Sequence, residues 1–291
     1  MLRISLLEEI GSHQSLTLEK LKAATSYVRV LSKYFIGSPR TKLYLRHLHS
    51  RLKAVTTASS PTSLLPIRHW IDLLKTNDTA YGVLPPKRAW NRCKGSAPKY
   101  RGYPCAVWTT FHAMSVAAAV DDDERLSVPT DDDSNVSNST EVVSYGTEVL
   151  DAMVGYMRNF FGCRHCARHF GEMVANSTND VSTYDDVVLW LWEAHNRVNR
   201  RLEEDATEDP KAPKIQFPGM EMCVDCRVGG GGGDWNRTYV LGFLKRHFSY
   251  PKLKIQDDEV NLALDSQNSS PCVQSNIFMF FLVFPLFLIY S

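Results

Sequence analysis

Apolar side chains recur every three or four positions through much of the chain, and this spacing predicts helices rather than strands. In the N-terminal part it predicts two helices within residues 16–57, with a break at Gly37-Ser38-Pro39. A stretch rich in serine, threonine and proline covers 56–66, and a short helix over 71–74 follows. No run of alternating apolar residues predicts a sheet. Two adjacent prolines then mark the end of a smaller helical region, which we place at residues 1–85.

Five further helices are predicted after Trp90, over residues 105–120, 149–161, 163–175, 184–202 and 235–248. The acidic stretch 121–140 interrupts them, and we expect it to be a solvated loop. A calcium site would need a more regular spacing of ligands and a glycine. The glycines at 229–233 predict a flexible linker, because no strand precedes them and no Lys-Ser/Thr follows, as a phosphate loop requires. The fold class expected from this pattern is all-α, with a second region at 86–250.

The hydrophobic tail, residues 277–291, follows a linker at 251–276 and carries no charge. As a helix, residues 277–290 extend about 21 Å, which is short for a hydrocarbon core of about 30 Å. We expect a short or truncated membrane anchor. A GPI-attachment signal, with the small residues Ser269 and Ser270 upstream, and a buried core element are the alternatives.

Composition narrows the class of protein. Lysine and arginine total 33 against 32 aspartates and glutamates, so the chain lacks the basic excess typical of nucleic-acid binders. The N-terminus has no signal-peptide pattern, because Glu8 and Glu9 interrupt the apolar stretch. We therefore expect a piece of a longer product, or a sequence that lacks its start.

Six N-x-S/T sequons favour the secretory pathway, in the ER, the Golgi or at the cell surface, and they begin at Asn77, Asn135, Asn138, Asn176, Asn236 and Asn268.

The cysteines carry the candidate chemistry. Six of the seven fall into close pairs at 93/105, 163/166 and 223/226, and Cys272 lies beside the hydrophobic tail. One interpretation is a Cys₄ zinc site made by the two C-x-x-C pairs, although their separation is far longer than in zinc ribbons.

A redox role fits the pair at 163/166 better. Gly162 precedes this pair, and a helix is expected to begin there. Helix amides and dipole, together with the basic residues that follow, stabilise a thiolate and lower a cysteine pKa from about 8.5 towards roughly 3.5–7.5. A static disulfide is the alternative.

Residues 90–248 resemble the flavin-binding sulfhydryl oxidase domain of the Erv/ALR type, most closely that of the quiescin sulfhydryl oxidases. The matching segments are RGYPCAVWTTFH, YMRNFFGCRHCARHF, LWLWEAHNRVNRRL, EDPKAPKIQFP and EMCVDC. The resemblance implies a bundle of four core helices plus a short fifth that holds FAD non-covalently. It also implies a thiol oxidase that takes electrons from dithiols and reduces O₂ to hydrogen peroxide.

The resemblance assigns roles to particular residues. It implies a redox-active disulfide in which Cys166 lies next to the flavin and Cys163 faces the incoming dithiol. It implies a structural Cys93–Cys105 disulfide, and an additional pair at Cys223–Cys226. No metal is expected. The FAD-binding positions that carry over are Arg101, Trp108, His112, His165, His169, Trp192, His195, Asn196, Val198, Asn199, Lys214 and Phe217.

Physical chemistry supports such a set. Trp108 and His112 are four residues apart and share a helix face. An adenine stacks on aromatic or imidazole faces. A pyrophosphate binds cations, for which Arg101, Lys214 and Arg197 are candidates.

The sequence also departs from the family pattern. His165 stands where an acidic residue is frequent, which should make the disulfide more oxidising or disturb a flavin contact. Phe217 stands where tryptophan is common. The family's thioredoxin domains have no counterpart here, so electrons would come from a separate thioredoxin-like protein, from Cys223/Cys226 or from small dithiols. The alternatives to an oxidase are a non-catalytic, membrane-anchored helical remnant and the zinc module.

Overall fold

The computed structural model describes residues 1–84, 89–127, 147–176, 181–230 and 234–249. The expected linker and hydrophobic tail, Cys272 and the sequons at Asn135, Asn138 and Asn268 lie outside these residues.

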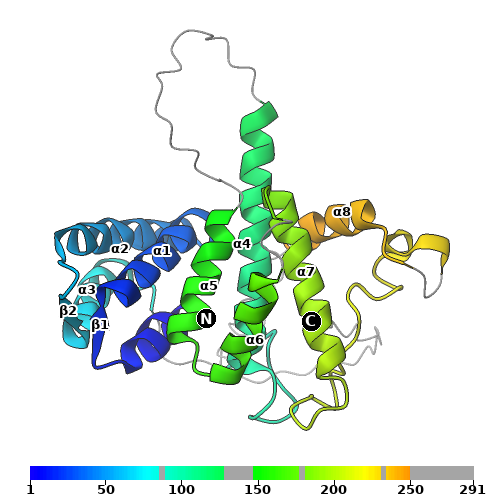
Figure 1. Cartoon of the computed structure of the whole chain (residues 1–291), viewed down its shortest axis with the longest axis horizontal. Coiled ribbons are helices and arrows are strands. Elements are labelled where there is room, and N and C mark those ends of the chain that lie inside the picture. The colour runs from blue at the N-terminus through cyan, green and yellow to red at the C-terminus, as the bar shows by residue number, and fades with distance from the viewer. Residues whose placement is uncertain (85–88, 128–146, 177–180, 231–233, 250–291) are drawn as a thin grey trace, which may run out of the picture.

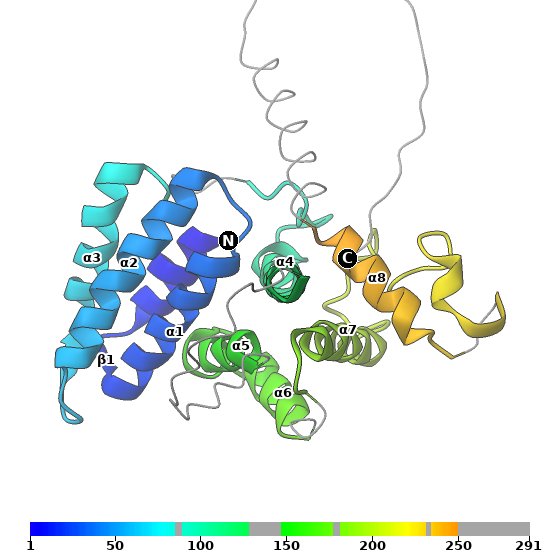
Figure 2. The same cartoon turned by 90° about the horizontal axis from the view of Figure 1, so that it is seen from above.

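The N-terminal region contains the two helices expected within 16–57. They are α1 (Leu18–Tyr34) and α2 (Pro39–Ala58), which pack side by side (Figure 2). The break between them has a local cause, because Ser38 caps α2 by accepting a hydrogen bond from the backbone N–H of Thr41 at 3.2 Å. Pro39 occupies the first turn, where its missing N–H costs nothing.

Other expectations for this region were wrong. The short helix expected at 71–74 is α3 (Ile67–Tyr81), 15 residues long. Two strands, β1 (Ser15–Thr17) and β2 (Leu64–Pro66), form an antiparallel pair where no sheet was predicted. Strands of three residues are too short to show alternation in a sequence. A π-helix (Ile4–Glu9) and a 3₁₀ turn (Ile10–Ser12) come before them.

The second region contains the predicted bundle. Its core helices are α4 (Gly102–Ser127), α5 (Glu148–Phe160), α6 (Arg164–Ala175) and α7 (Tyr184–Arg201), and the short fifth is α8 (Arg237–His247). Figure 1 shows α1–α3 on one side of these core helices and α8 on the other. Short 3₁₀ turns at Val224–Cys226 and Val228–Gly230 precede α8.

The helix α4 is longer than predicted. Residues 121–127 continue it, so the first part of the acidic stretch is helical and not a loop. Two of the acidic groups around it are paired across the bundle, since the Lys245 ammonium of α8 lies 2.7 Å from Asp123 and 2.7 Å from Asp185.

The two regions share one hydrophobic core. The rings of Tyr27 on α1 and Tyr156 on α5 stack 4.3 Å apart. At the start of α5, the Glu148 carboxylate pairs with Lys33 and Arg29 of α1, both at 2.9 Å. The N-terminal region is therefore packed directly against the bundle. In the described part of the chain, no helix is both long and apolar enough to cross a membrane.

Candidate active site

The Cys163–Cys166 disulfide lies at the start of α6. The two sulfurs are bonded at 2.07 Å, and Cys163 is the N-cap residue of the helix. Its Sγ accepts a hydrogen bond from the backbone N–H of Cys166 at 3.2 Å. Both cysteines are solvent-exposed. An incoming thiolate can reach the pair, and the helix N-terminus stabilises a leaving thiolate there.

The other two expected disulfides are also formed. Cys93–Cys105 ties the segment before α4 to its first turns, and the N–H of Gly102 donates to the carbonyl of Cys93 at 2.9 Å. Cys223–Cys226 encloses a 3₁₀ turn. Because a disulfide leaves no thiolate for a metal, these pairings are incompatible with the Cys₄ zinc site. Among the described residues, no cluster of His, Cys, Asp and Glu could hold a metal ion.

A cavity of about 380 Å³ opens beside the redox disulfide. It lies among α4, α5, α6, α7 and the loop at 207–217, and both Cys163 and Cys166 line it. The predicted cofactor residues that also line it are Arg101, Trp108, His112, His169, His195, Val198, Asn199, Lys214 and Phe217. Its volume is in the range of roughly 300–1,000 Å³ typical of small-molecule sites.

Stacked aromatic and imidazole rings form one wall of the cavity. Trp108 and His195 stack 4.2 Å apart at an angle of 5°, which brings α4 and α7 together. His112 Nε2 and His195 Nδ1 lie 3.1 Å apart, so one nitrogen donates to the other. Burial lowers the pKa of His112 to about 3, with His247 contributing, and lowers the pKa of His195 well below its ordinary value, with His112 and Lys214 contributing. Both imidazoles are therefore neutral at physiological pH.

Cations gather elsewhere along the cavity. Lys99, Arg101 and Lys214 line it, and burial, followed by the Arg101 charge, lowers the pKa of Lys214. Asp209 holds the loop that carries Lys214, because its carboxylate accepts hydrogen bonds from the Ser96 hydroxyl at 2.5 Å and the Ser96 N–H at 2.8 Å. The cavity thus has positive potential in addition to flat apolar faces.

Three predicted cofactor residues do not line the cavity. Trp192 and Asn196 face the loop behind it, and both donate to the Phe217 carbonyl, at 2.6 Å from Trp192 Nε1 and 2.7 Å from Asn196 Nδ2. The Phe217 N–H donates to Asn196 Oδ1 at 2.7 Å. These two side chains therefore hold Phe217, which lines the cavity, and do not line it themselves. His165 is exposed, and its Nε2 lies 2.9 Å from Nε2 of His169.

Other lining residues were missed. Phe111 and Cys105 could have been found, because they lie three residues from Trp108 on one helix face. Lys99, Asp209 and Phe248 come from loops or a helix end and carried no sequence signal.

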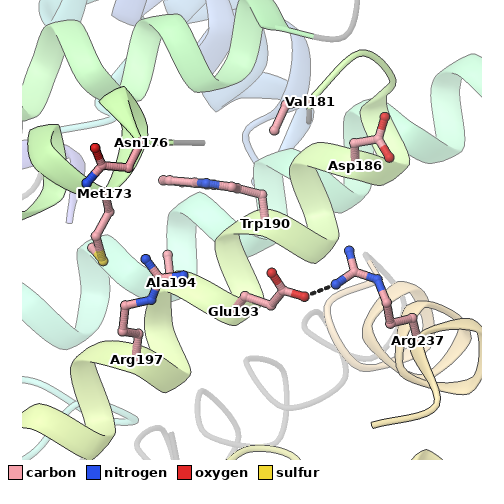
Figure 3. Close-up of a pocket in the computed structure, with 9 residues that line it drawn as sticks. All are labelled: Met173, Asn176, Val181, Asp186, Trp190, Glu193, Ala194, Arg197 and Arg237. Carbon is pink, nitrogen blue, oxygen red and sulfur yellow. Dashed lines mark hydrogen bonds and ion pairs between the residues drawn. The ribbon is translucent and has the colours of Figure 1, made fainter. Parts of the chain in front are cut away.

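A second cavity, of about 390 Å³, is lined by residues of α6 and α7 and by Arg237 of α8 (Figure 3). Trp190 and Met173 line it, and an ion pair between Glu193 and Arg237 crosses its edge. It contains no cysteine. Arg197 lines this cavity and not the one beside the disulfide, and its expected role as a pyrophosphate cation stays a prediction.

Comparisons with known proteins agree with this site. A model of the Erv1 / Alr family matches residues 105–218, and a model of the flavin adenine dinucleotide (FAD)-dependent sulfhydryl oxidases matches residues 1–96. The solved sulfhydryl oxidase fragment of human QSOX1 is 34% identical, with a TM-score of 0.72, and the match covers 86% of this chain and 92% of that one. The chain belongs to the sulfhydryl oxidase family.

Curated members of the family are longer than this chain. Sulfhydryl oxidase 1 of Gallus gallus is 39% identical over 84% of this chain and 30% of its own length. Sulfhydryl oxidase 2 of Homo sapiens is 35% identical over 84% of this chain and 33% of its own length. The chain thus spans about a third of the length of these relatives.

The residues present fit the FAD on which this family depends. The neutral, stacked imidazoles offer flat faces without a buried charge, and the cations at Arg101 and Lys214 suit a pyrophosphate. The redox disulfide lines the same cavity.

Proposed function

We propose that this chain is a thiol oxidase that converts dithiols to disulfides and uses O₂ as the electron acceptor. One observation carries the proposal: the Cys163–Cys166 disulfide is exposed to solvent and also lines the cavity that holds the FAD-binding candidates. A dithiol and a flavin can therefore reach the same disulfide.

The reaction begins as thiol–disulfide exchange. A substrate thiolate attacks Sγ of Cys163, the bond to Cys166 breaks, and Cys166 leaves as a thiolate stabilised by the N-terminus of α6. The second substrate thiolate attacks the substrate sulfur of this mixed disulfide. Oxidised substrate leaves, and both site cysteines are then reduced.

Bound FAD would supply the two-electron transfer from the reduced cysteine pair to O₂, which with two protons gives hydrogen peroxide. The side chains of the cavity bind and orient this cofactor. Trp108 and His195 provide stacking faces, Arg101 and Lys214 provide positive charge, and Trp192 and Asn196 hold the loop at Phe217 in place.

The donor that we propose is a reduced protein or small dithiol, with a separate thioredoxin-like protein as one source. We also propose a lumenal or extracellular setting. Three disulfides and six sequons support this, because disulfides persist in oxidising compartments. Of the sequon asparagines, Asn176 is exposed at the end of α6, where it is open to glycosylation. We further propose that the tail at 277–291 anchors the chain to a membrane.

Oxygen uptake with dithiothreitol tests the activity. The expected result is one peroxide formed for each O₂ consumed, and loss of uptake in Cys166→Ser, because that cysteine completes the redox disulfide. A folded protein that binds no flavin points to the non-catalytic remnant. Normal turnover in Cys166→Ser would remove the site assignment.

A further inference from the structure

The Glu9 carboxylate of the N-terminal region contacts the redox turn, residues 162–166. Glu9 is the last residue of the π-helix Ile4–Glu9, and its Oε2 accepts a hydrogen bond from the backbone N–H of Gly162 at 2.5 Å. Gly162 immediately precedes Cys163, although it is 153 residues from Glu9 in the sequence. The contact thus joins the N-terminal region to the backbone of the disulfide.

The carboxylate is packed closely against this turn. A Cβ atom added to Gly162 would lie 3.2 Å from Glu9 Oε1, so the absence of a side chain at 162 admits the carboxylate. Partial burial raises the pKa of Glu9, while the Gly162 N–H and the charge of Arg164 on α6 oppose the rise. Glu8 adds repulsion, and the phenols of Tyr103 and Tyr156 lie within electrostatic range.

The segment that presents Glu9 is itself held firmly. The neighbouring Ile10 and Leu6 are fully buried. The indole N–H of Trp70 on α3 donates to the Leu6 carbonyl at 2.8 Å. His13 packs edge-on against Phe160 at the end of α5. Glu9 therefore extends from a backbone segment that is held in place by buried side chains and a hydrogen bond.

We propose that Glu9 is a positioning residue for thiol–disulfide exchange at Cys163. The redox turn loses its covalent cross-link in each cycle, when the Cys163–Cys166 bond opens. The Glu9 hydrogen bond does not depend on that bond, so it keeps the backbone at 162–163 in place in the reduced form. The N-terminal region then acts as part of the active site and not only as a spacer. This inference rests on the thiol oxidase activity proposed above.

The test measures flavin reduction by dithiothreitol in the FAD-loaded full chain without oxygen. For Glu9→Ala we expect the second-order rate constant of this reduction to fall about tenfold, less than the roughly 100-fold that a 1 Å misplacement can cost. Flavin content should be unchanged. Glu9→Gln keeps an acceptor oxygen and should recover most of the rate. The matched control is Glu8→Ala, because Glu8 is an exposed neighbour that pairs with Arg3 at 3.8 Å, and it should react like the unmodified chain.

A second variant approaches the contact from the other side. Gly162→Ala places its methyl group against the Glu9 carboxylate and should slow the reaction in the unmodified background. With Glu9→Ala the obstruction is gone, so adding Gly162→Ala should cost little more. If Glu9→Ala does not fold, Gly162→Ala alone provides the test, and a rate equal to that of the unmodified chain contradicts the role of Glu9.

The outcomes separate the two proposals. No flavin reduction in the unmodified chain contradicts the oxidase activity itself. Normal reduction there, with Glu9→Ala as fast as Glu8→Ala or with strictly additive effects of the two substitutions, contradicts only the role of Glu9.

Discussion

Replacing Asn196 with alanine should loosen the loop that forms one wall of the cofactor cavity. The Asn196 side chain is 6% exposed and makes two hydrogen bonds of 2.7 Å, one to the carbonyl and one to the N–H of Phe217. After the change, the Phe217 carbonyl still accepts a hydrogen bond from Trp192, but the Phe217 N–H loses Asn196 Oδ1 as its acceptor. A lost hydrogen bond costs about 1 kcal/mol, and a buried donor left without an acceptor costs about 1–3 kcal/mol. We expect the free energy of unfolding to fall by about 2–4 kcal/mol.

The same change should weaken FAD binding, because Phe217 and Ile215 line the cavity. A loss of about 1.4 kcal/mol in binding already raises the Kd tenfold. Urea unfolding and the flavin retained after gel filtration measure the two effects. Asn159→Ala is the matched control, since Asn159 makes one hydrogen bond of 2.9 Å to Gly155 within α5 and does not line the cavity. Equal stability and flavin retention in the two variants would refute the reasoning.

The remaining predictions concern a disulfide, an ion pair and a histidine. Cys226→Ser should leave dithiothreitol oxidation mostly intact, because neither cysteine of that disulfide lines the cavity; near-total loss of oxygen uptake would make the pair an obligatory shuttle. Burial raises the pKa of Glu148, but the hydrogen bonds from Lys33 and Tyr34 and the charges of Lys33 and Arg29 outweigh burial and leave the pKa below its ordinary value. The stabilisation from ionised Glu148 is therefore present above pH ~4.3, the unfolded-state value, and is lost as the pH falls through the folded pKa. Glu148→Gln should therefore lower the free energy of unfolding at pH 7 by about 1–3 kcal/mol, with urea curves converging in acid; an equal difference at pH 7 and in acid speaks against this. His165→Asp should make the redox disulfide less oxidising in a glutathione-buffer titration, and an unchanged or higher potential removes that role for His165.

Periodicity could predict the long helices because each buries one face in a common core. It could not reveal β1 and β2, whose pairing joins residues 47 to 51 positions apart through strands of only three residues. The helical segment 121–127 was missed because its acidic composition resembles a loop. In the folded protein, Asp123 of this segment pairs with Lys245 of α8, and only the fold brings these two residues together.

The candidate site shows the same division. The C-x-x-C pair, the motif around Trp108 and the motif around His195 could be recognised in the sequence, because each is a continuous segment at or within one helix. The family resemblance carried Trp192 and Asn196 over as cofactor contacts. It could not show that both side chains hydrogen-bond to Phe217 in the loop behind the cavity. The contact between Glu9 and Gly162 joins distant parts of the chain and had no sequence signal.

The most direct test of the account is the visible absorption spectrum of the purified chain, recorded without oxygen before and after dithiothreitol, and again in air. The account predicts a flavin band that dithiothreitol bleaches and air restores, because the Cys163–Cys166 disulfide lines the cavity that we propose for the cofactor. A folded, colourless protein, or a flavin band that dithiothreitol leaves unchanged, would contradict it.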